Sequence, residues 1–255
     1  MRRLAPAAAG LSALLALAAC GGGASAAPPT PTGPTSGTVT DRSLPSGVLD
    51  LPLTDADGSR VTLRHLAAGG AVVVTDFLTT CQEVCPMTSV DMRDAADQAR
   101  RQGLADRVRF VEITVDPERD DRARLAAYRA LFGATRPNWS FATSSPASIA
   151  QVWSAFGVSY SRAPEDDPPA TDWLTGKPLT YDVTHQDAVF LVDREGHERW
   201  LEIGQPDTRG QAPPPVLARF LNDEGRKNLA SPDGPVWTAG DVEDAVAWWL
   251  RTAAS

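Results

Sequence analysis

The feature that most constrains the fold is a β-branched run, AVVVTDF at 71–77, that leads into a pair of cysteines at the start of a helix. A near-continuous apolar run of this length is typical of a central strand that is covered on both faces. Cys81 and Cys85 follow the run, and Pro86 suits the first turn of the helical pattern over 87–102. In α/β sheets, chemistry gathers where strands end and helices begin. The sequence therefore places both cysteines at such an edge.

The rest of the chain predicts alternating strands and helices, then a hairpin and a final helix. Apolar periodicity and turn residues place strands at 108–115, 139–142, 188–192 and 198–203, and helices at about 121–131, 146–156 and 241–252. Asp120 is the expected N-cap of the helix that starts near 121. Residues 48–66 alternate around Asp57-Gly58, which predicts a hairpin before the central strand. The expected fold is an α/β sandwich with a mixed central sheet flanked by helices and an added N-terminal hairpin.

The N-terminus has the pattern of a secretory signal. Two arginines precede an apolar stretch at 11–17 that is shorter than a membrane span requires. The run LAAC at 17–20 resembles a bacterial lipobox, in which cleavage before Cys20 leaves that cysteine to carry a lipid. An ordinary signal peptide with a coincidental cysteine is the alternative. We expect a signal peptide at 1–19 and a lipid-anchored protein on the extracytoplasmic face of a bacterial cell membrane.

Composition separates a spacer from a folded region and excludes one class of partner. From Cys20 to Gly37 the chain is Gly, Ser, Ala, Thr and Pro without a charge, which predicts a flexible, lipid-anchored linker over 20–44 and a folded domain with a C-terminal extension over 45–255. The chain has 24 Lys and Arg against 32 Asp and Glu and no basic block, so nucleic acid is not an expected partner.

The two cysteines of the folded region suit metal binding or redox exchange. At a helix N-terminus both sulfurs feel the positive end of the helix dipole, which favours the thiolate. Three intervening residues allow Cys81 and Cys85 to form a disulfide or to share one metal ion. Structural zinc usually takes four protein ligands, whereas two thiolates with one imidazole suit copper, above all Cu(I). A disulfide that only staples the loop is the alternative, although so short a loop constrains little unfolded-state entropy.

Position alone does not identify the histidine that would complete such a site. His185 lies in a loop before the strand at 188–192, where a histidine is more often solvated or hydrogen-bonded. His197 follows a tight turn and is expected to face solvent, and His65 is expected to be structural. Met87 and Met92 offer thioethers, but at helical spacing methionines are more often core fillers.

Three separate stretches resemble the Sco/SenC family in their order along the chain. The first is the strand-to-Cys-x-x-x-Cys-Pro passage over 72–88, the second is ITVDPERD over 113–120, and the third places His185 ahead of DREG at 193–196. Each motif is weak alone, whereas the three together are specific. The resemblance covers about 48–203.

The resemblance implies a thioredoxin-like copper protein of cytochrome c oxidase assembly. It implies copper, as Cu(I) or Cu(II), as the cofactor and Cys81, Cys85 and His185 as its ligands. The implied function is delivery of copper to cytochrome c oxidase subunit II by a membrane-tethered protein. A thiol reductant, such as a thioredoxin-like protein, is the second expected partner.

The chain also departs from the family's pattern near the expected ligands. Members often have Pro and then Asp after the first cysteine, where this chain has Gln82 and Glu83. An Asp often precedes the ligand histidine, whereas Thr184 stands here, so a supporting carboxylate is either lost or supplied by Asp182. The segment 204–235 has no counterpart that the resemblance places.

Two other classes of function remain open from the sequence. A thiol-disulfide oxidoreductase would cycle Cys81 and Cys85 between dithiol and disulfide, as a catalytic redox pair that reduces the cysteines of the same oxidase subunit or of another exported protein. A lipid-anchored adaptor would hold the same pair as a static disulfide. The copper protein is favoured over the enzyme because a redox pair alone has no use for His185.

Overall fold

The computed structural model describes residues 33–253, and every structural statement below concerns that part of the chain. The expected signal peptide and the lipid-carrying Cys20 lie outside the described residues. No helix among the described residues is long and apolar enough to cross a membrane.

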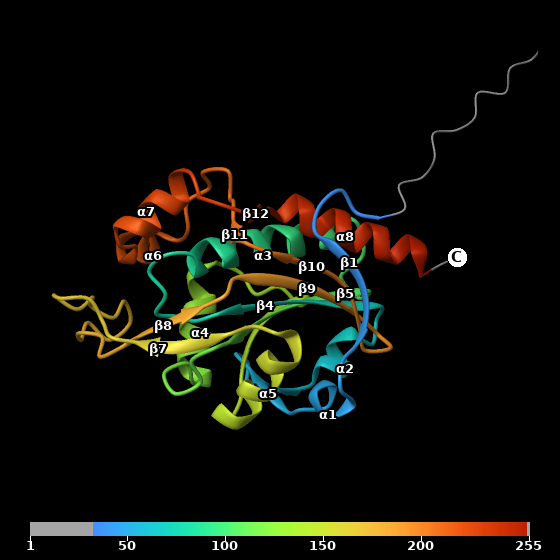
Figure 1. Cartoon of the computed structure of the whole chain (residues 1–255), viewed down its shortest axis with the longest axis horizontal. Helices are drawn as coiled ribbons and strands as arrows, with labels where there is room; N and C mark the ends of the chain where they lie inside the picture. Colours follow the sequence, from blue (N-terminus) through green and yellow to red (C-terminus); the bar gives the residue numbers. More distant parts are fainter. Residues whose placement is uncertain (1–32, 254–255) are drawn as a thin grey trace, which may run out of the picture. The chain divides into compact units, whose positions relative to one another are not determined.

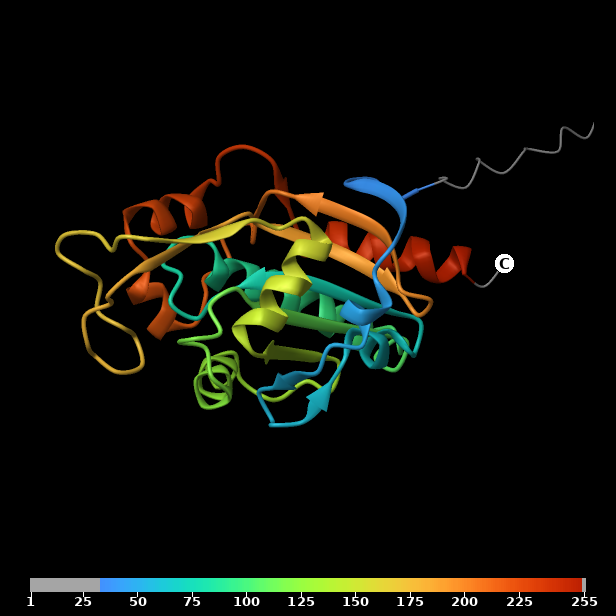
Figure 2. The same ribbon diagram turned by 60° about the horizontal axis from the view of Figure 1, so that its bottom comes forward.

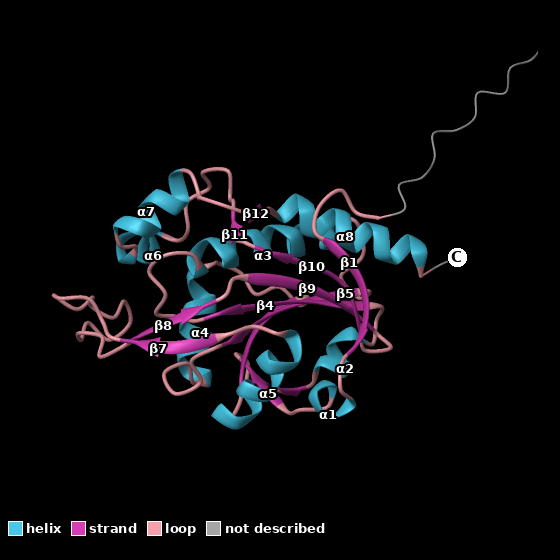
Figure 3. Cartoon of the chain, viewed as in Figure 1, coloured by secondary structure: helices cyan, strands magenta, loops and turns pink. Residues whose placement is uncertain are grey.

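The centre of the fold is an eight-stranded mixed sheet with helices on both faces (Figures 1 and 3). Its strand order is β1 (Thr38–Ser43), β10 (His197–Ile203), β9 (Ala188–Asp193), β4 (Ala71–Phe77), β5 (Val108–Thr114), β6 (Trp139–Thr143), β2 (Leu53–Asp55) and β3 (Arg60–Val61). Strands β4, β5 and β6 are parallel, while β9 lies antiparallel to β4.

The helices follow the strands in the alternation that the sequence predicts. They are α1 (Ser46–Leu49), α2 (Leu63–Ala67), α3 (Cys85–Arg101), α4 (Arg122–Leu131), α5 (Pro146–Phe156), α6 (Pro215–Phe220), α7 (Asp223–Ala230) and α8 (Ala239–Thr252). Helices α3 and α8 pack together on one face of the sheet, and α5 lies on the other (Figures 1 and 2). The predicted fold class, an α/β thioredoxin-like sandwich with a mixed sheet and an N-terminal hairpin, is confirmed.

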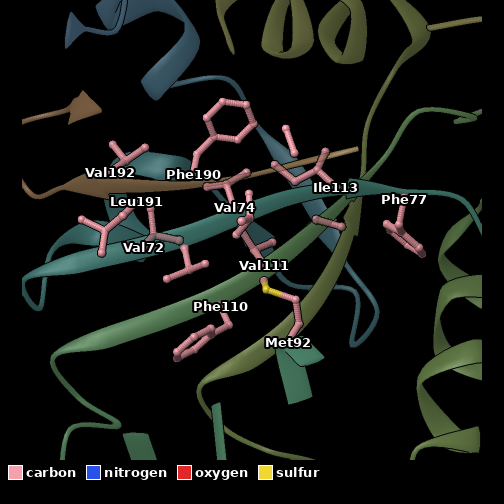
Figure 4. Close-up of a cluster of buried hydrophobic side chains, with 14 of the residues drawn as sticks. Val72, Val74, Phe77, Met92, Phe110, Val111, Ile113, Phe190, Leu191 and Val192 are labelled. Atoms are coloured by element: carbon pink, nitrogen blue, oxygen red, sulfur yellow. The ribbon is translucent and has the colours of Figure 1, made fainter. Parts of the chain in front are cut away.

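Strand β4 is central because its sequence can be buried on both sides. All seven of its residues are buried, and β5 and β9 flank it. Val72 and Val74 lie among side chains of the neighbouring strands, and Met92 of α3 belongs to the same hydrophobic cluster (Figure 4). Because this strand is fixed on both faces and both edges, the loop that follows it starts from a rigid position.

Two expectations about boundaries are wrong. The predicted linker over 20–44 includes β1, which pairs antiparallel with β10, because TVTDRS contains β-branched residues that suit an edge strand. The N-cap of α4 is Asp121, whose side chain accepts a hydrogen bond from the Arg124 N–H, and not Asp120.

The expectation that His65 is a structural residue is also wrong, because its side chain is exposed.

Two parts of the fold have no counterpart in the sequence prediction. Strands β7 (Tyr160–Ala163) and β8 (Asp182–His185) form a separate antiparallel pair, called here the β7–β8 arm. Between β10 and α8, the chain forms α6, α7 and a short parallel pair of β11 (Gln205–Pro206) and β12 (Val236–Trp237). Figure 1 shows α6 and α7 at the same end of the sheet as the arm.

Candidate metal centre

Cys81 and Cys85 lie in the loop after β4 and at the first residue of α3. Cys85 is fully buried, and Cys81 retains 8% exposure at the wall of a cavity. The backbone N–H groups of Val84 and Cys85 donate hydrogen bonds to Cys81 Sγ, each with an N···Sγ distance of 3.4 Å. These are amides of a helix N-terminus, which carries partial positive charge and favours a thiolate. Both cysteines are free thiols in this structure.

The β7–β8 arm brings His185 to the thiols across a hundred residues of sequence. His185 is the last residue of β8, where it pairs with Tyr160 of β7. Its Nε2 lies 3.4 Å from Cys85 Sγ. One donor atom each from Cys81, Cys85 and His185 all lie within 4.8 Å of one another. The structure thus brings together the three residues that the resemblance implies as ligands.

Asp76 fixes the orientation of that imidazole. Its Oδ2 lies 2.5 Å from His185 Nδ1, and its Oδ1 accepts the Ala188 N–H over 3.2 Å. Because Nδ1–H donates to this carboxylate, Nε2 is the ring nitrogen that faces Cys85. Asp182, the carboxylate that the sequence offered for this role, instead accepts the N–H of its neighbour Val183. The overlooked signal was a lone carboxylate inside the apolar run at 71–77.

The contacts within this group separate the pKa values of the two thiols. A hydrogen bond from Cys85, together with His185, holds the pKa of Cys81 well below its ordinary value against the effect of burial. Burial and the neighbouring Cys81 raise the pKa of Cys85 well above its ordinary value. Burial alone would lower the pKa of His185, but the Asp76 carboxylate holds it well above its ordinary value. The resulting charge pattern places the thiolate on the sulfur that lines the cavity.

Asp120 anchors the loop that carries Cys81. Its carboxylate accepts a hydrogen bond from the Thr79 N–H at a distance of 3.1 Å. It also accepts hydrogen bonds from the Thr79 hydroxyl at 2.5 Å and from the Thr114 hydroxyl at 2.6 Å. Burial raises the pKa of Asp120 to about 6. This carboxylate therefore ties the start of the loop to the end of β5, which explains why Asp120 does not cap α4.

The α6–α7 segment forms a second support for the same loop. The Asn222 N–H donates to the Gln82 carbonyl over 3.1 Å, and Asn222 Nδ2 donates to Glu83 Oε1 over 3.0 Å. A Cβ at Gly225 would lie 2.0 Å from the Gln82 carbonyl oxygen, so only glycine allows this approach of α7. The sequence carries no local pattern that predicts these contacts.

The remaining candidates do not join the centre. Met87 and Met92 are buried in α3, as expected of core residues. His197 is half-buried on β10, with Nδ1 2.9 Å from Asp41 Oδ1 and Nε2 3.1 Å from Ser43 Oγ.

Comparison with known proteins gives consistent relatives. A sequence model of the SCO1/SenC family matches residues 47–206. The SCO1 protein homolog of Bacillus subtilis is 29% identical over 142 residues, which are 55% of this chain and 65% of that protein. The mitochondrial SCO2 homolog of Bos taurus is 30% identical over 147 residues, which are 58% of this chain and 50% of that protein. The chain therefore spans between 50% and 65% of the length of these curated relatives.

Solved structures show the same fold. The crystal structure of Arabidopsis thaliana ScoI with copper bound aligns with a TM-score of 0.52 and 22% identity, over 79% of this chain and 96% of that chain. At this identity the similarity concerns the fold alone.

Proposed function

This chain belongs to the SCO1/SenC family, and from that premise we propose that it binds one copper ion through Cys81, Cys85 and His185 and delivers it during assembly of cytochrome c oxidase. The acceptor in this proposal is subunit II of the oxidase. The protein works on the extracytoplasmic face of the membrane, tethered by a lipid on Cys20, and a thiol reductant keeps its cysteines reduced.

The observation that carries the proposal is the convergence of three soft or borderline donors at one point. Two thiols and one imidazole nitrogen lie within 4.8 Å of one another, and Asp76 already orients the imidazole. Thiolates select Cu(I), and imidazole also accommodates Cu(II), so the donor set fits copper in either state. The set holds too few ligands for a closed structural zinc site.

The chain's own residues set how such an ion is held and released. Asp76 keeps His185 Nε2 turned toward Cys85, and Asp120 fixes the loop on which Cys81 stands. Cys81 lines the cavity while Cys85 is fully buried, so an approaching protein meets Cys81 first. Exchange of the two thiolate ligands is thus expected to begin at Cys81, with Cys85 released afterwards.

Replacing His185 by alanine tests the ligand assignment. We expect copper affinity to fall by at least about 100-fold, which is more than the loss expected when a residue that only supports a ligand is replaced. The affinity for Cu(II) should fall more than the affinity for Cu(I). Competition titration with a chelator and the sulfur-to-Cu(II) absorption band of the full chain measure this. His197→Ala is the matched control, because His197 lies on β10 away from the thiols. Equal affinity in the two variants contradicts the assignment.

The unequal pKa values of the two thiols favour one second function. A low-pKa thiol at a cavity wall, backed by a buried partner, is the arrangement of a nucleophilic and a resolving cysteine. In this function the pair would reduce disulfides of an exported protein. Reduction of insulin by the metal-free chain with dithiothreitol, compared with Cys85→Ser, measures it. Rapid turnover that depends on Cys85 supports the oxidoreductase, and absence of turnover contradicts it.

A further inference from the structure

The cavity beside Cys81 carries a second kind of recognition: we propose that it receives a cationic side chain, lysine or arginine, from the protein that approaches that thiol. The proposal rests on the proposed function and deepens it, because exchange at Cys81 requires another polypeptide to reach this cavity.

The wall of the cavity is strongly acidic. The cavity has a volume of about 280 Å³, and its lining contains no Lys or Arg. The carboxylates among its lining residues are Glu83, Glu165, Asp166, Asp182, Asp187 and Glu224. Glu224 also lies 3.5 Å from the exposed Lys227 ammonium on α7, outside the lining. His185 is the one basic residue of the lining, and its Nδ1 is already paired with Asp76. A concave surface on which carboxylates outnumber the basic groups focuses its field on an entering cation.

Buried acceptors without donors give a second, independent indication. Asn228 is only 4% exposed, lines the cavity, and its Oδ1 has no hydrogen-bond partner among the described residues. Glu165 and Gln205 are half-buried residues of the same lining, and their atoms Oε2 and Oε1 are also buried without a hydrogen-bond partner among the described residues. Buried acceptors are nearly always paired in native proteins. A lysine ammonium brings three donors and an arginine guanidinium five, with no acceptor, so either one complements this wall.

The C-terminal segment supplies part of this wall. Asn228 and Glu224 both lie on α7, and the contacts of Asn222 and Gly225 with Gln82 hold that helix against the cysteine loop. Helix α7 lies beyond residues 47–206, the range that the family model matches. Part of the recognition proposed here therefore comes from residues outside the range that the family model matches.

Small disulfides of different charge probe the cavity. In each reaction the Cys81 thiolate attacks one sulfur of the reagent, the reagent's S–S bond breaks, and one reagent half leaves as a thiolate that takes up a proton. Cystamine places an ammonium next to the attacked sulfur, and 3,3′-dithiodipropionate places a carboxylate there. The readout is the ratio of their second-order rate constants, divided by the same ratio for N-acetylcysteine to remove leaving-group differences. The full chain carries Cys20→Ser, which leaves Cys81 and Cys85 as its thiols.

We expect a corrected ratio of about 100 at low salt, within the range that focused charge produces. In 1 M salt, where screening acts over about 3 Å, a ratio well above one should remain if the ammonium docks in the cavity. Glu165→Gln/Asp182→Asn should lower the ratio at both salt concentrations, and Asn228→Leu should lower the part that persists in high salt. The control variant, Asp106→Asn/Glu195→Gln, removes the same charge from exposed residues that do not line the cavity.

Three results would overturn the proposal. One is a corrected ratio near one in the unaltered protein, and another is equal loss in the cavity variant and the control variant. The third is removal of the high-salt ratio by millimolar Ca²⁺, which would make the cavity a site for metal ions.

Copper stoichiometry of the same variants separates the two proposals. Failure of copper binding with an intact ratio removes the proposed function alone, and an unchanged ratio with intact copper binding removes the cationic side chain alone.

Discussion

Two carboxyl groups buried in neighbouring strands serve different ends. Asp76 at the end of β4 contacts a histidine that faces the thiols, whereas Glu112 in β5 accepts only from neutral donors, Ser89 Oγ over 2.6 Å and Trp139 Nε1 over 2.9 Å. Burial raises the pKa of Glu112 to about 8. The hydrogen-bond partner therefore decides the role of each buried acid. Asp76 contacts an imidazole and so orients an expected copper ligand. Glu112 contacts only neutral donors and so links α3, β5 and β6.

The largest expected effect is on the pH dependence of stability. Glu112 binds its proton up to about pH 8 in the folded chain, compared with an ordinary value of 4.5. Its contribution to stability is therefore fully present below pH 4.5 and is lost as pH rises through about 8, by about 1.4 kcal/mol for each unit in between. Glu112→Gln should remove this slope, which urea unfolding from pH 5 to 8 measures. Asp91, whose pKa burial also raises to about 8, leaves a residual slope of the same sign in both proteins. Parallel curves for Glu112→Gln and the unaltered protein would show that Glu112 is already ionised.

The next effect concerns copper and separates the two carboxyl groups. Asp76→Asn should lower copper affinity by about 10- to 100-fold, because the imidazole loses the partner that orients it. Glu112→Gln is the matched control and should change affinity by less than about twofold, since neither donor of Glu112 belongs to the centre. Chelator competition at one pH measures both variants. Equal losses would mean that any buried carboxyl group near β4 supports the site, and would contradict the distinct roles of Asp76 and Glu112.

The smallest effect tests the neutral donors of Glu112. Ser89→Ala removes one of its two hydrogen bonds and should cost about 1 kcal/mol of unfolding free energy at pH 5, without a change in copper affinity. Equilibrium denaturation and the same chelator competition provide the two readouts. A loss of affinity in this variant would connect the Glu112 cluster to the centre through α3.

Much of the sheet follows from local patterns, because β4, β5, α3 and α5 carry periodicities that burial on this fold requires. The site followed only in part. The residues alone indicated the cysteine pair, and His185 came from the resemblance, since the position of a histidine in a loop does not tell where the loop folds. Asp76 was hidden because its role depends on the pairing of β4 with β9, which brings Ala188 and His185 to it.

Short segments with long-range partners account for the other differences. Strand β1 was assigned to the linker because its partner, β10, is more than 150 residues away. Helix α6 has only six residues, too few to show a helical period. Helix α7 has few apolar residues and is held by the contact of Asn222 with the Gln82 carbonyl, which leaves no pattern in the sequence.

The separate pairing of the β7–β8 arm has a mechanical consequence. The two thiols belong to the main sheet and its helix, whereas the imidazole stands on a ladder that pairs with no strand of that sheet. An ion held by all three would act as a reversible cross-link between the arm and the main sheet, in addition to the contact between Asp76 of β4 and His185. Movement of His185 away from the thiols would then loosen a short ladder and the Asp76 contact, while the hydrophobic interior stays intact.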